Sequence, residues 1–435
     1  MPRARCLLAV FLLGSPIVLA QGFFVGDPAA GPASMAASWV AYPEDQTIVI
    51  FNPAGIVRVK DGLAGNATLV HFTTGKYTRL PDDKNNFQKY GAEELDKPTF
   101  LGAPMLAAVD NLGLDRWKFG LSSNLQFGSK LDFDENGVQR YMMKKVDLHV
   151  LDQNFTAAYA IDDHWSVGGA LVYAVAVVKE DVDLDLASLL DPNVQPSELP
   201  ENRLPTTVSL DDNAFGGNFG VLYDSDKVKA GFMYQTPVTL KLKGDVTTDL
   251  AAIPQALKDL LGVSGNELVL KASMELKLPQ YVRAGVAFHP ADHLWISTEL
   301  FWIDWSTLEA FDVHLAPNPI NVTSYVIPRH WDDGIAFKIG ADYKWNDRNR
   351  FRAGTFYVDA PTKRQYIQLD IPDNNRYGLC LGWSHDFKGP FSLDLAYVHQ
   401  FLKDWHIEDS LQNPKVNGDI KVNFGSLLAT VRYNF

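Results

Sequence analysis

The sequence contains very little cysteine, and this limits how the fold can be held together. Only Cys6 and Cys380 occur in 435 residues. Cys6 falls in the N-terminal leader described below, so one cysteine would remain in the mature chain and no internal disulfide could form. A disulfide-stapled secreted domain is therefore excluded.

After the leader, the sequence also lacks an apolar run long enough for a membrane-spanning helix. Such a helix needs about 20 apolar residues, and the longest run, residues 170–178, is about half that length. No basic cluster is present, and the formal net charge is −13. An acidic chain without a basic patch is a poor candidate for binding nucleic acid.

The first twenty residues have the pattern of a secretory signal peptide. Arg3 and Arg5 give a positive start, residues 6–13 form a short apolar core, and Val18-Leu19-Ala20 supplies small residues before Gln21. We expect residues 1–20 to be removed on export, which leaves the mature chain more acidic still.

A two-residue period runs through most of the remaining chain. In residues 117–127, for example, Trp, Phe and Leu alternate with Lys, Gly, Ser, Asn and Gln, as a strand between two different environments requires. A soluble β-sandwich would also alternate. Two features favour a membrane barrel: the opposite face is polar enough for a wet interior, and aromatic residues recur at strand ends, as in interfacial girdles. These are Trp117, Trp165, Tyr223, Trp295, Trp345 and Tyr433.

Fourteen such segments can be counted between residues 62 and 435. A lipid-exposed sheet must close, and bacterial single-chain barrels have an even number of strands. The sequence therefore predicts an all-β fold: a 14-stranded antiparallel transmembrane β-barrel over residues 61–435. Residues 21–60 are rich in Ala, Gly, Ser and Pro, and we expect them to form a compact N-terminal hatch inside the lumen.

The stretch Asn52-Pro53-Ala54-Gly55 predicts a rigid corner at the end of the hatch. Proline fixes its own φ and restricts the residue before it, and glycine can adopt backbone angles that a side chain would forbid.

Several short motifs resemble those of the FadL-type family of outer-membrane long-chain fatty-acid transporters. They are Asn52-Pro53-Ala54-Gly55, Leu278-Pro279 with Arg283 and Gly285, Trp331-Asp332 ahead of Ile339-Gly340, and Ile371-Pro372-Asp373 followed by Arg376. They occur in the family's order over essentially the whole mature chain. The resemblance implies that a hydrophobic ligand is caught on an extracellular groove, passes to a lumenal pocket, and leaves sideways at a kink in the third strand.

The kink should fall where the alternation of the third strand meets a glycine. This points to Gln126, Phe127 and Gly128, with Gly128 as the residue that breaks the strand. The alternative is a plain strand end or a tight side-chain contact.

Two apolar loop segments could form the extracellular groove. One carries Leu186, Leu189 and Leu190; the other carries Ile253, Leu257, Leu260 and Leu261 at helical spacing. Exposed apolar helices on the rim would suit adsorption of a fatty acid. The same leucines could instead cap the barrel by packing on one another.

Inside the barrel, a carboxylate ligand would need a cation or a set of hydrogen-bond donors. Residues of inward parity offer Lys118, Lys338 and Arg352, and the mature N-terminus brings Phe23 and Phe24 as apolar contacts. Inward basic residues could equally pair with acids across the lumen.

No catalytic or metal-binding motif stands out. Asp132–Gly137 begins like a calcium loop, but its twelfth position is Met143 rather than Glu, so a hairpin turn explains it better. His385-Asp386 and Ser392 leave a barrel lipase or palmitoyltransferase as a minor alternative.

The sequence thus predicts a monomeric bacterial outer-membrane channel without cofactor. Its partners would be outer-membrane lipid, including lipopolysaccharide, and a hydrophobic small molecule, most simply a long-chain fatty acid. A hydrocarbon or aromatic-compound transporter of the same fold, a general porin and a surface adhesin remain as alternatives.

Overall fold

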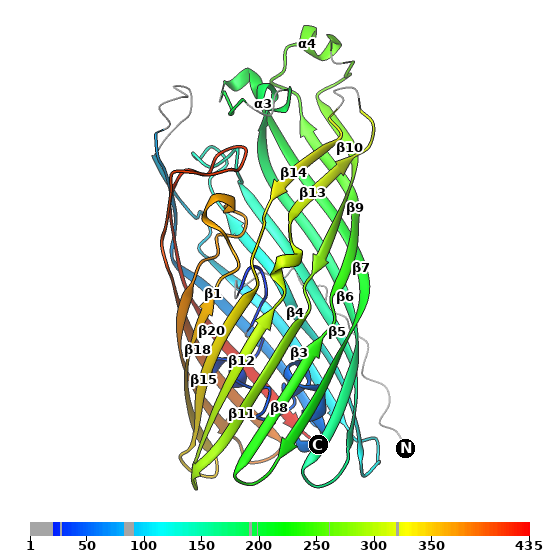
Figure 1. Cartoon of the computed structure of the whole chain (residues 1–435), viewed down its shortest axis with the longest axis vertical. Helices are drawn as coiled ribbons and strands as arrows, with labels where there is room; N and C mark the ends of the chain where they lie inside the picture. Colours follow the sequence, from blue (N-terminus) through cyan, green and yellow to red (C-terminus); the bar gives the residue numbers. More distant parts are fainter. Residues whose placement is uncertain are drawn as a thin grey trace.

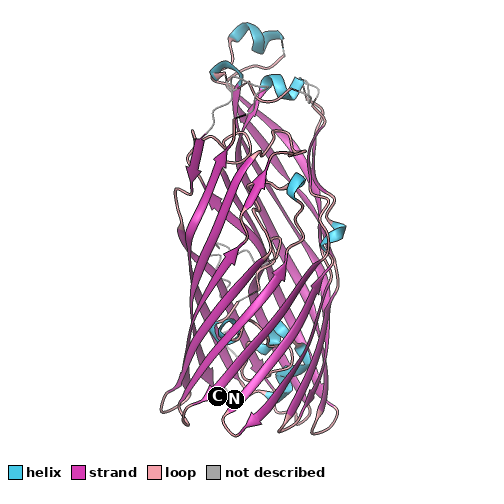
Figure 2. Cartoon of the chain, turned by 60° about the vertical axis from the view of Figure 1, so that its left-hand side comes forward, coloured by secondary structure: helices cyan, strands magenta, loops and turns pink. Residues whose placement is uncertain are grey.

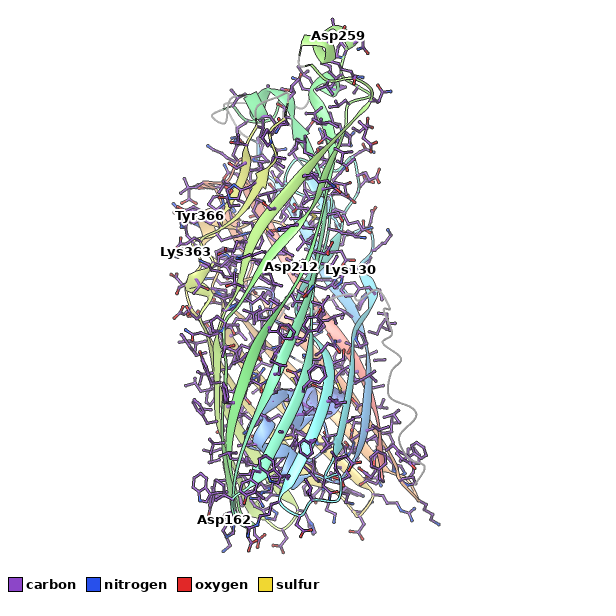
Figure 3. All side chains as sticks on the ribbon, turned by 90° about the vertical axis from the view of Figure 1, so that its right-hand side faces the viewer. Lys130, Asp162, Asp212, Asp259, Lys363 and Tyr366 are labelled. Carbon is purple, nitrogen blue, oxygen red and sulfur yellow. The ribbon has the colours of Figure 1, made fainter. Side chains whose placement is uncertain are left out.

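The computed structural model describes residues 21–26, 28–81, 91–190, 194–197, 199–260, 262–318 and 322–435. The predicted signal peptide, residues 1–20, lies outside the described residues. The described chain is a tall closed barrel with short turns at one end and longer loops at the other (Figure 1). Asp162 in a short turn and Asp259 in a loop helix mark these opposite ends (Figure 3).

Fourteen antiparallel strands form the wall in the described part of the chain. The unbroken ones are β1 (Gly62–Arg79), β3 (Thr99–Asp110), β4 (Trp117–Asp132), β5 (Lys145–Ala160), β6 (Trp165–Asp185), β7 (Arg203–Asp224), β16 (Asn349–Asp359), β17 (Arg376–Asp386), β18 (Phe391–Leu402) and β20 (Gly418–Asn434). The others are split into two pieces: β8 (Val228–Gln235) with β9 (Val238–Asp249), β10 (Glu267–Leu278) with β11 (Tyr281–Ala291), β12 (Leu294–Ile303) with β13 (Ala310–Leu315), and β14 (Ser324–Pro328) with β15 (Gly334–Lys344). β1 pairs with both β3 and β20, which closes the barrel and confirms the predicted fold class.

Side chains alternate between the outer surface and the lumen along each strand, because successive residues point to opposite faces. In β17, Leu379 and Leu381 are more than half exposed on the outside, whereas Cys380 between them is buried. Aromatic pairs such as Trp165 and Tyr223, whose ring centroids are 5.1 Å apart, lie beside the short turn that contains Asp162. In the described part of the chain, no helix is both long and apolar enough to cross a membrane.

Residues 28–59 of the predicted hatch fold inside the barrel at the end with short turns (Figure 2). They contain α1 (Ala30–Ser34), α2 (Ile48–Phe51) and the 3-10 helix η1 (Pro53–Arg58). The run Ile48–Phe51 is one helical turn although β-branched residues favour strands, because burial in the lumen outweighs that weak preference. Almost every residue of this segment is buried.

The corner Asn52–Gly55 is held by the side chain of Asn52. Its Oδ1 accepts from the N–H of Ala54 at 3.1 Å, and its Nδ2 donates to the carbonyl oxygen of Val40 at 2.9 Å. The expectation for Gly55 was wrong: it lies within η1 and does not adopt a positive φ. Glycine is required there because a Cβ would collide with the side chain of Ile48.

Several shorter strands and helices lie outside the long strands of the wall. β2 (Gly91–Glu94) pairs with β1, and β19 (Trp405–Ile407) pairs with β20. The loops carry α3 (Leu186–Leu190), η2 (Pro200–Asn202), α4 (Gln255–Leu260) and η4 (Arg364–Tyr366), and η3 (Trp305–Thr307) lies between β12 and β13, the two pieces of one wall strand.

Candidate functional site

Phe23 and Phe24 sit in a buried cluster of aromatic rings inside the barrel. The ring of Phe23 lies 4.7 Å from Trp305 and 5.7 Å from Phe127, centroid to centroid. The ring of Phe24 lies 4.9 Å from Phe301 and 5.3 Å from Tyr281. The cluster is completed by Phe311 and Trp331. Aromatic pairs at these separations attract each other by more than the area they bury would account for. These contacts therefore hold residues 21–26, which we call the N-terminal segment, in place inside the barrel.

The turn that presents these two rings depends on Gly22. Its φ is +59°, and a Cβ would stand 2.7 Å from Trp331 and 2.9 Å from Trp305. Glycine alone meets both requirements at low cost. Its N–H donates to Oδ2 of Asp373 at 2.6 Å.

A small lumenal cavity adjoins Phe24. Its apolar wall includes Phe301 and Phe356, and its polar wall includes Gln21, Lys338 and Gln400. The Oε1 atoms of Gln21 and Gln400 are buried and have no hydrogen-bond partner among the described residues. Binding pockets for small molecules have the same composition: their walls are mostly apolar and carry a few polar groups.

Lys338 belongs to a buried ion cluster beside this cavity. Its Nζ lies 3.2 Å from Oε1 of Glu299, and Nη1 of Arg283 lies 2.8 Å from the same oxygen. Oε2 of Glu299 accepts from the N–H groups of Trp39 and Val40, each at 3.1 Å. The three charged side chains carry two positive charges and one negative charge, and Nε of Arg283 has no partner among the described residues.

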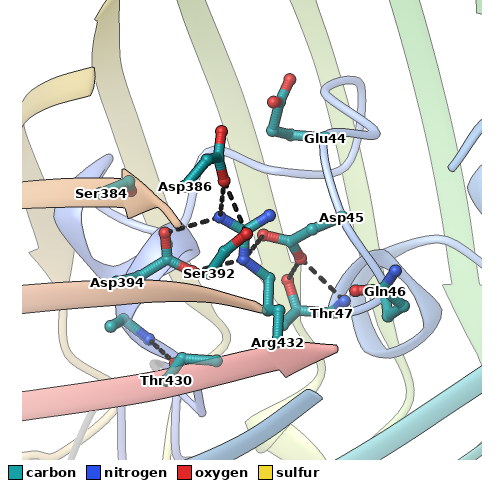
Figure 4. A network of polar contacts seen from close by, with 12 residues as sticks. Glu44, Asp45, Gln46, Thr47, Ser384, Asp386, Ser392, Asp394, Thr430 and Arg432 are labelled. Carbon is teal, nitrogen blue, oxygen red and sulfur yellow. Dashed lines mark hydrogen bonds and ion pairs between the residues drawn. The ribbon is translucent and has the colours of Figure 1, made fainter. Parts of the chain in front are cut away.

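Arg352 belongs to a different network, which fastens the hatch to the wall. Its Nε lies 2.8 Å from Asp342 and its Nη1 lies 3.5 Å from Asp394. Arg432 bridges the same Asp394 at 2.7 Å to Asp45 of the hatch at 3.9 Å (Figure 4). The prediction that Arg352 contacts the ligand is thus not supported by its position, because both of its acid partners are already buried against it.

Lys118 is also paired, with Asp61 at 2.9 Å, and donates to the carbonyl oxygen of Val59. These contacts join the end of the hatch to β4. Of the predicted lumenal residues, the structure therefore brings Phe24 and Lys338 together at the cavity, places Phe23 in the adjoining aromatic cluster, and leaves Lys118 and Arg352 outside the cavity.

The irregularity of β4 lies at Gln126. Pairing with β5 is regular up to Leu125 opposite Leu151 and resumes at Phe127 opposite Val150, so Gln126 is the extra residue of a β-bulge. The bulge inverts the alternation and turns Phe127 into the lumen. Gly128 lies in regular register, so the prediction that it breaks the strand was wrong: an inserted residue, not a missing side chain, bends β4.

The bulge also marks the place where β3 leaves β4. Their pairing ends at Met105 opposite Asn124. Beyond that point the N-terminal segment pairs with β4 instead: the N–H of Val25 donates to the carbonyl oxygen of Gln126 at 2.8 Å. The N–H of Gly128 donates to the carbonyl oxygen of Phe23 at 2.5 Å. The N-terminal segment thus occupies the edge of β4 that β3 leaves unpaired.

The two apolar loop segments that were predicted to form the extracellular groove contribute to one buried cluster. Leu186 and Ile253 are buried together with Leu204, Leu250 and Val263, and Leu189 packs against them. Leu261 lies outside the described residues, as do the side chains of Leu190, Leu257 and Leu260. For Leu186 and Ile253, mutual packing explains the apolar pattern as well as ligand adsorption does.

Sequence reasoning did not single out Glu299 or Asp373 as site residues. Glu299 is the one charged residue of β12 and occupies an inward position, and that signal was available. Asp373 belongs to a motif that was noted only for its resemblance, and its contact with Gly22 joins residues 351 positions apart. In the described part of the chain, no three His, Cys, Asp or Glu residues are grouped to hold a metal ion.

Comparison with known proteins places the chain in a family. The family model of the outer membrane protein transport proteins (OMPP1/FadL/TodX) matches residues 11–435. Outer membrane protein P1 of Haemophilus influenzae is 24% identical over 314 residues, which cover 68% of this chain and 65% of that protein. The match thus spans just under two thirds of that relative. The long-chain fatty acid transport protein of Escherichia coli O157:H7 is 23% identical, over 66% of this chain and 68% of that protein.

Solved structures show the same fold. A Pseudomonas aeruginosa FadL homologue superposes with a TM-score of 0.79 at 20% identity, over 95% of this chain and 100% of that one. The Ralstonia pickettii toluene transporter TbuX gives a TM-score of 0.68 at 17% identity, over 96% and 100%. The predicted outer-membrane location is confirmed. The chain belongs to the outer membrane protein transport family (OMPP1/FadL/TodX).

Proposed function

We propose that this protein takes up long-chain fatty acids across the bacterial outer membrane by diffusion, without catalysis. The observation that carries the proposal is the buried ion cluster beside the lumenal cavity. Lys338 and Arg283 place two buried cationic side chains at Glu299 beside the apolar cavity, and Nε of Arg283 has no hydrogen-bond partner among the described residues. Charge-assisted hydrogen bonds from cationic side chains are strong in such surroundings, and a ligand carboxylate would accept them.

The route follows from the fold. The apolar cluster around Leu186 and Ile253 lies on the extracellular loops, where it would adsorb the ligand. The hatch closes the opposite end of the barrel, held by the Arg432 and Arg352 networks. The ligand would leave sideways where β3 and β4 part, once residues 23–25 release the edge of β4.

A second ligand class is favoured by the rings themselves. The cluster around Phe23 and Phe24 would accept a planar aromatic compound if those two side chains withdrew. Such a neutral ligand would not use the charge of Lys338. The two ligand classes can therefore be separated by one substitution.

The test is binding of oleate and of toluene to the purified barrel and to the variant Lys338→Met. We expect oleate affinity to fall about tenfold or more, because a hydrogen bond to a charged group is lost, with toluene binding unchanged. Lys118→Met is the control, since Lys118 is paired at the foot of the hatch. Equal oleate affinity in wild type and Lys338→Met would refute the fatty-acid proposal, and tight toluene binding alone would favour the aromatic class.

A further inference from the structure

The lumenal cavity contains hydrogen-bond acceptors that the carboxylate of a simple fatty acid cannot satisfy. Among the described residues, the polar side chains that line it are Gln21, Lys338 and Gln400. Both glutamines are 1% exposed, and the Oε1 atom of each has no hydrogen-bond partner in the described part of the chain. Buried polar atoms in folded proteins nearly always have a partner. Two unpartnered acceptors in one cavity therefore indicate that a bound molecule supplies a donor.

The strand register places Gln400 and Lys338 at the same level of the lumenal wall. Lys338 of β15 lies opposite Phe356 of β16. Phe356 lies opposite Gly378 of β17, which in turn lies opposite Gln400 of β18. A Cβ on Gly378 would stand 2.2 Å from the ring of Phe356, so this ring lies over the glycine. The ring thus forms an apolar wall of the cavity between the ammonium group and the amide.

Gln21 reaches the same cavity from the N-terminal segment. Its Nε2 donates to the carbonyl oxygen of Asp359 at 3.3 Å. A Cβ on Gly334 would stand 2.1 Å from the Nε2 atom, so the amide packs closely against the beginning of β15. On β15, Ala336 is the buried residue between Gly334 and Lys338, and it also lines the cavity. A small side chain therefore separates the amide of Gln21 from the ammonium group.

A hydroxyl group close to a carboxylate would match these three polar side chains. An ionised carboxylate only accepts hydrogen bonds, so it can pair with Lys338 but gives the glutamine oxygens no donor. A hydroxyl group both donates and accepts, so it suits a primary amide in either orientation. Because the three side chains line one small cavity, the carboxylate and the hydroxyl must be near neighbours on the ligand.

We propose that the lumenal cavity selects fatty acids that carry a hydroxyl group on carbon 2 or 3, and that Gln21 and Gln400 recognise this hydroxyl. The carboxylate lies at Lys338, so the inference rests on the proposed function and narrows its substrate class. A site that hydrogen-bonds a substrate hydroxyl discriminates against the analogue without it, because the buried polar groups of the site are then left unpaired.

The test compares the affinities of the purified protein for 3-hydroxymyristate and for myristate. We expect the wild-type protein to bind the hydroxy acid about fivefold more tightly, as one additional hydrogen bond would give. The variant Gln400→Met removes the amide from the cavity and should reduce this preference. Gln368→Met is the matched control: Oε1 of Gln368 is also buried without a partner among the described residues, but Gln368 does not line the cavity. This control should keep the wild-type preference.

A second pair of acids tests the position of the hydroxyl. A hydroxyl on carbon 12 lies too far from the carboxylate to reach the amides, so 12-hydroxystearate should bind no more tightly than stearate. An equal gain from hydroxyls on carbon 3 and on carbon 12 would overturn the assignment to carbon 2 or 3. Equal wild-type affinities for myristate and 3-hydroxymyristate would overturn the inference as a whole. A preference that is unchanged in Gln400→Met would overturn the role of that residue.

The methyl esters of the two 14-carbon acids separate this inference from the proposed function. The esters carry no negative charge, so their binding does not depend on pairing with Lys338. A preference for the hydroxy ester that falls in Gln400→Met would support recognition of the hydroxyl even if Lys338→Met left oleate affinity unchanged. In that case the fatty-acid proposal would fail and the hydroxyl site would stand.

Discussion

Gln126 and Tyr281 lie on strands that are not neighbours in the wall, yet their side chains meet inside the barrel. Nε2 of Gln126 donates to the hydroxyl of Tyr281 at 3.0 Å, and that hydroxyl donates to Oε1 of Gln235 at 2.6 Å. Nδ2 of Asn124 donates to Oε1 of Gln126 at 2.8 Å. The bulge residue of β4 is therefore tied to β8 and β11 by a continuous chain of buried polar side chains.

Replacing Tyr281 with Phe should loosen the bulge. The change leaves Nε2 of Gln126 and Oε1 of Gln235 buried without the hydroxyl that they share, which costs about 1–3 kcal/mol. We expect faster hydrogen exchange in residues 125–128 and a lower unfolding temperature. Tyr77→Phe is a matched control, since Tyr77 is equally buried and its hydroxyl donates to the carbonyl oxygen of Asn417 at 2.9 Å, away from the bulge. Unchanged exchange at the bulge in Tyr281→Phe would show that the side chains do not hold it.

A side chain at position 168 should displace the hatch. A Cβ on Gly168 would stand 2.6 Å from the carbonyl carbon of Pro53, in the corner that ends the hatch. Backbone cannot yield as a flexible side chain does, so Gly168→Ala should raise ion conductance in planar bilayers while the barrel stays folded. Gly169→Ala is the neighbouring control on the outer face, where the nearest atom would be 3.4 Å away. Equal, low conductance in both variants would show that the corner adapts.

A charge within the extracellular cluster should reduce capture of the ligand. Ile253 is 3% exposed and packs with Leu186 and its neighbours. Ile253→Asp would bury an unpaired carboxylate, so the cluster should open and uptake of labelled oleate into cells should fall several-fold. Leu199→Asp, at a loop position that is 38% exposed, should have no such effect. If uptake by Ile253→Asp equalled that of the control, the cluster would be only a cap.

The alternation of apolar and polar residues was enough to predict the barrel, because each wall strand faces lipid on one side and the lumen on the other. The glycines and prolines of the motifs could also be found from the sequence, because their effects on the backbone are local. The roles of single residues were harder to assign. Gly55 and Gly128 were both given backbone roles, whereas the structure assigns close packing to Gly55 and moves the strand irregularity to Gln126.

For the charged residues of the lumen, too, the local pattern predicted the strand face but not the role of each residue. Inward parity correctly placed Lys118, Lys338 and Arg352 on the inner face of the barrel, but it gave no means of telling which one adjoins a cavity. That depends on which acid faces each base across the lumen: Asp61 for Lys118, Glu299 for Lys338, and Asp342 with Asp394 for Arg352.

By itself, then, the sequence determined the closed antiparallel barrel, its outward apolar face and the hatch at its N-terminus, because these follow from short-range periodicity and composition. Only the tertiary structure decided which residues fill the lumen and which of them contact one another. The buried run of residues 367–374, the bulge at Gln126 and the contact between Gly22 and Asp373 depend on residues far apart in the chain. Such contacts are set by the folded geometry of the lumen rather than by any local pattern.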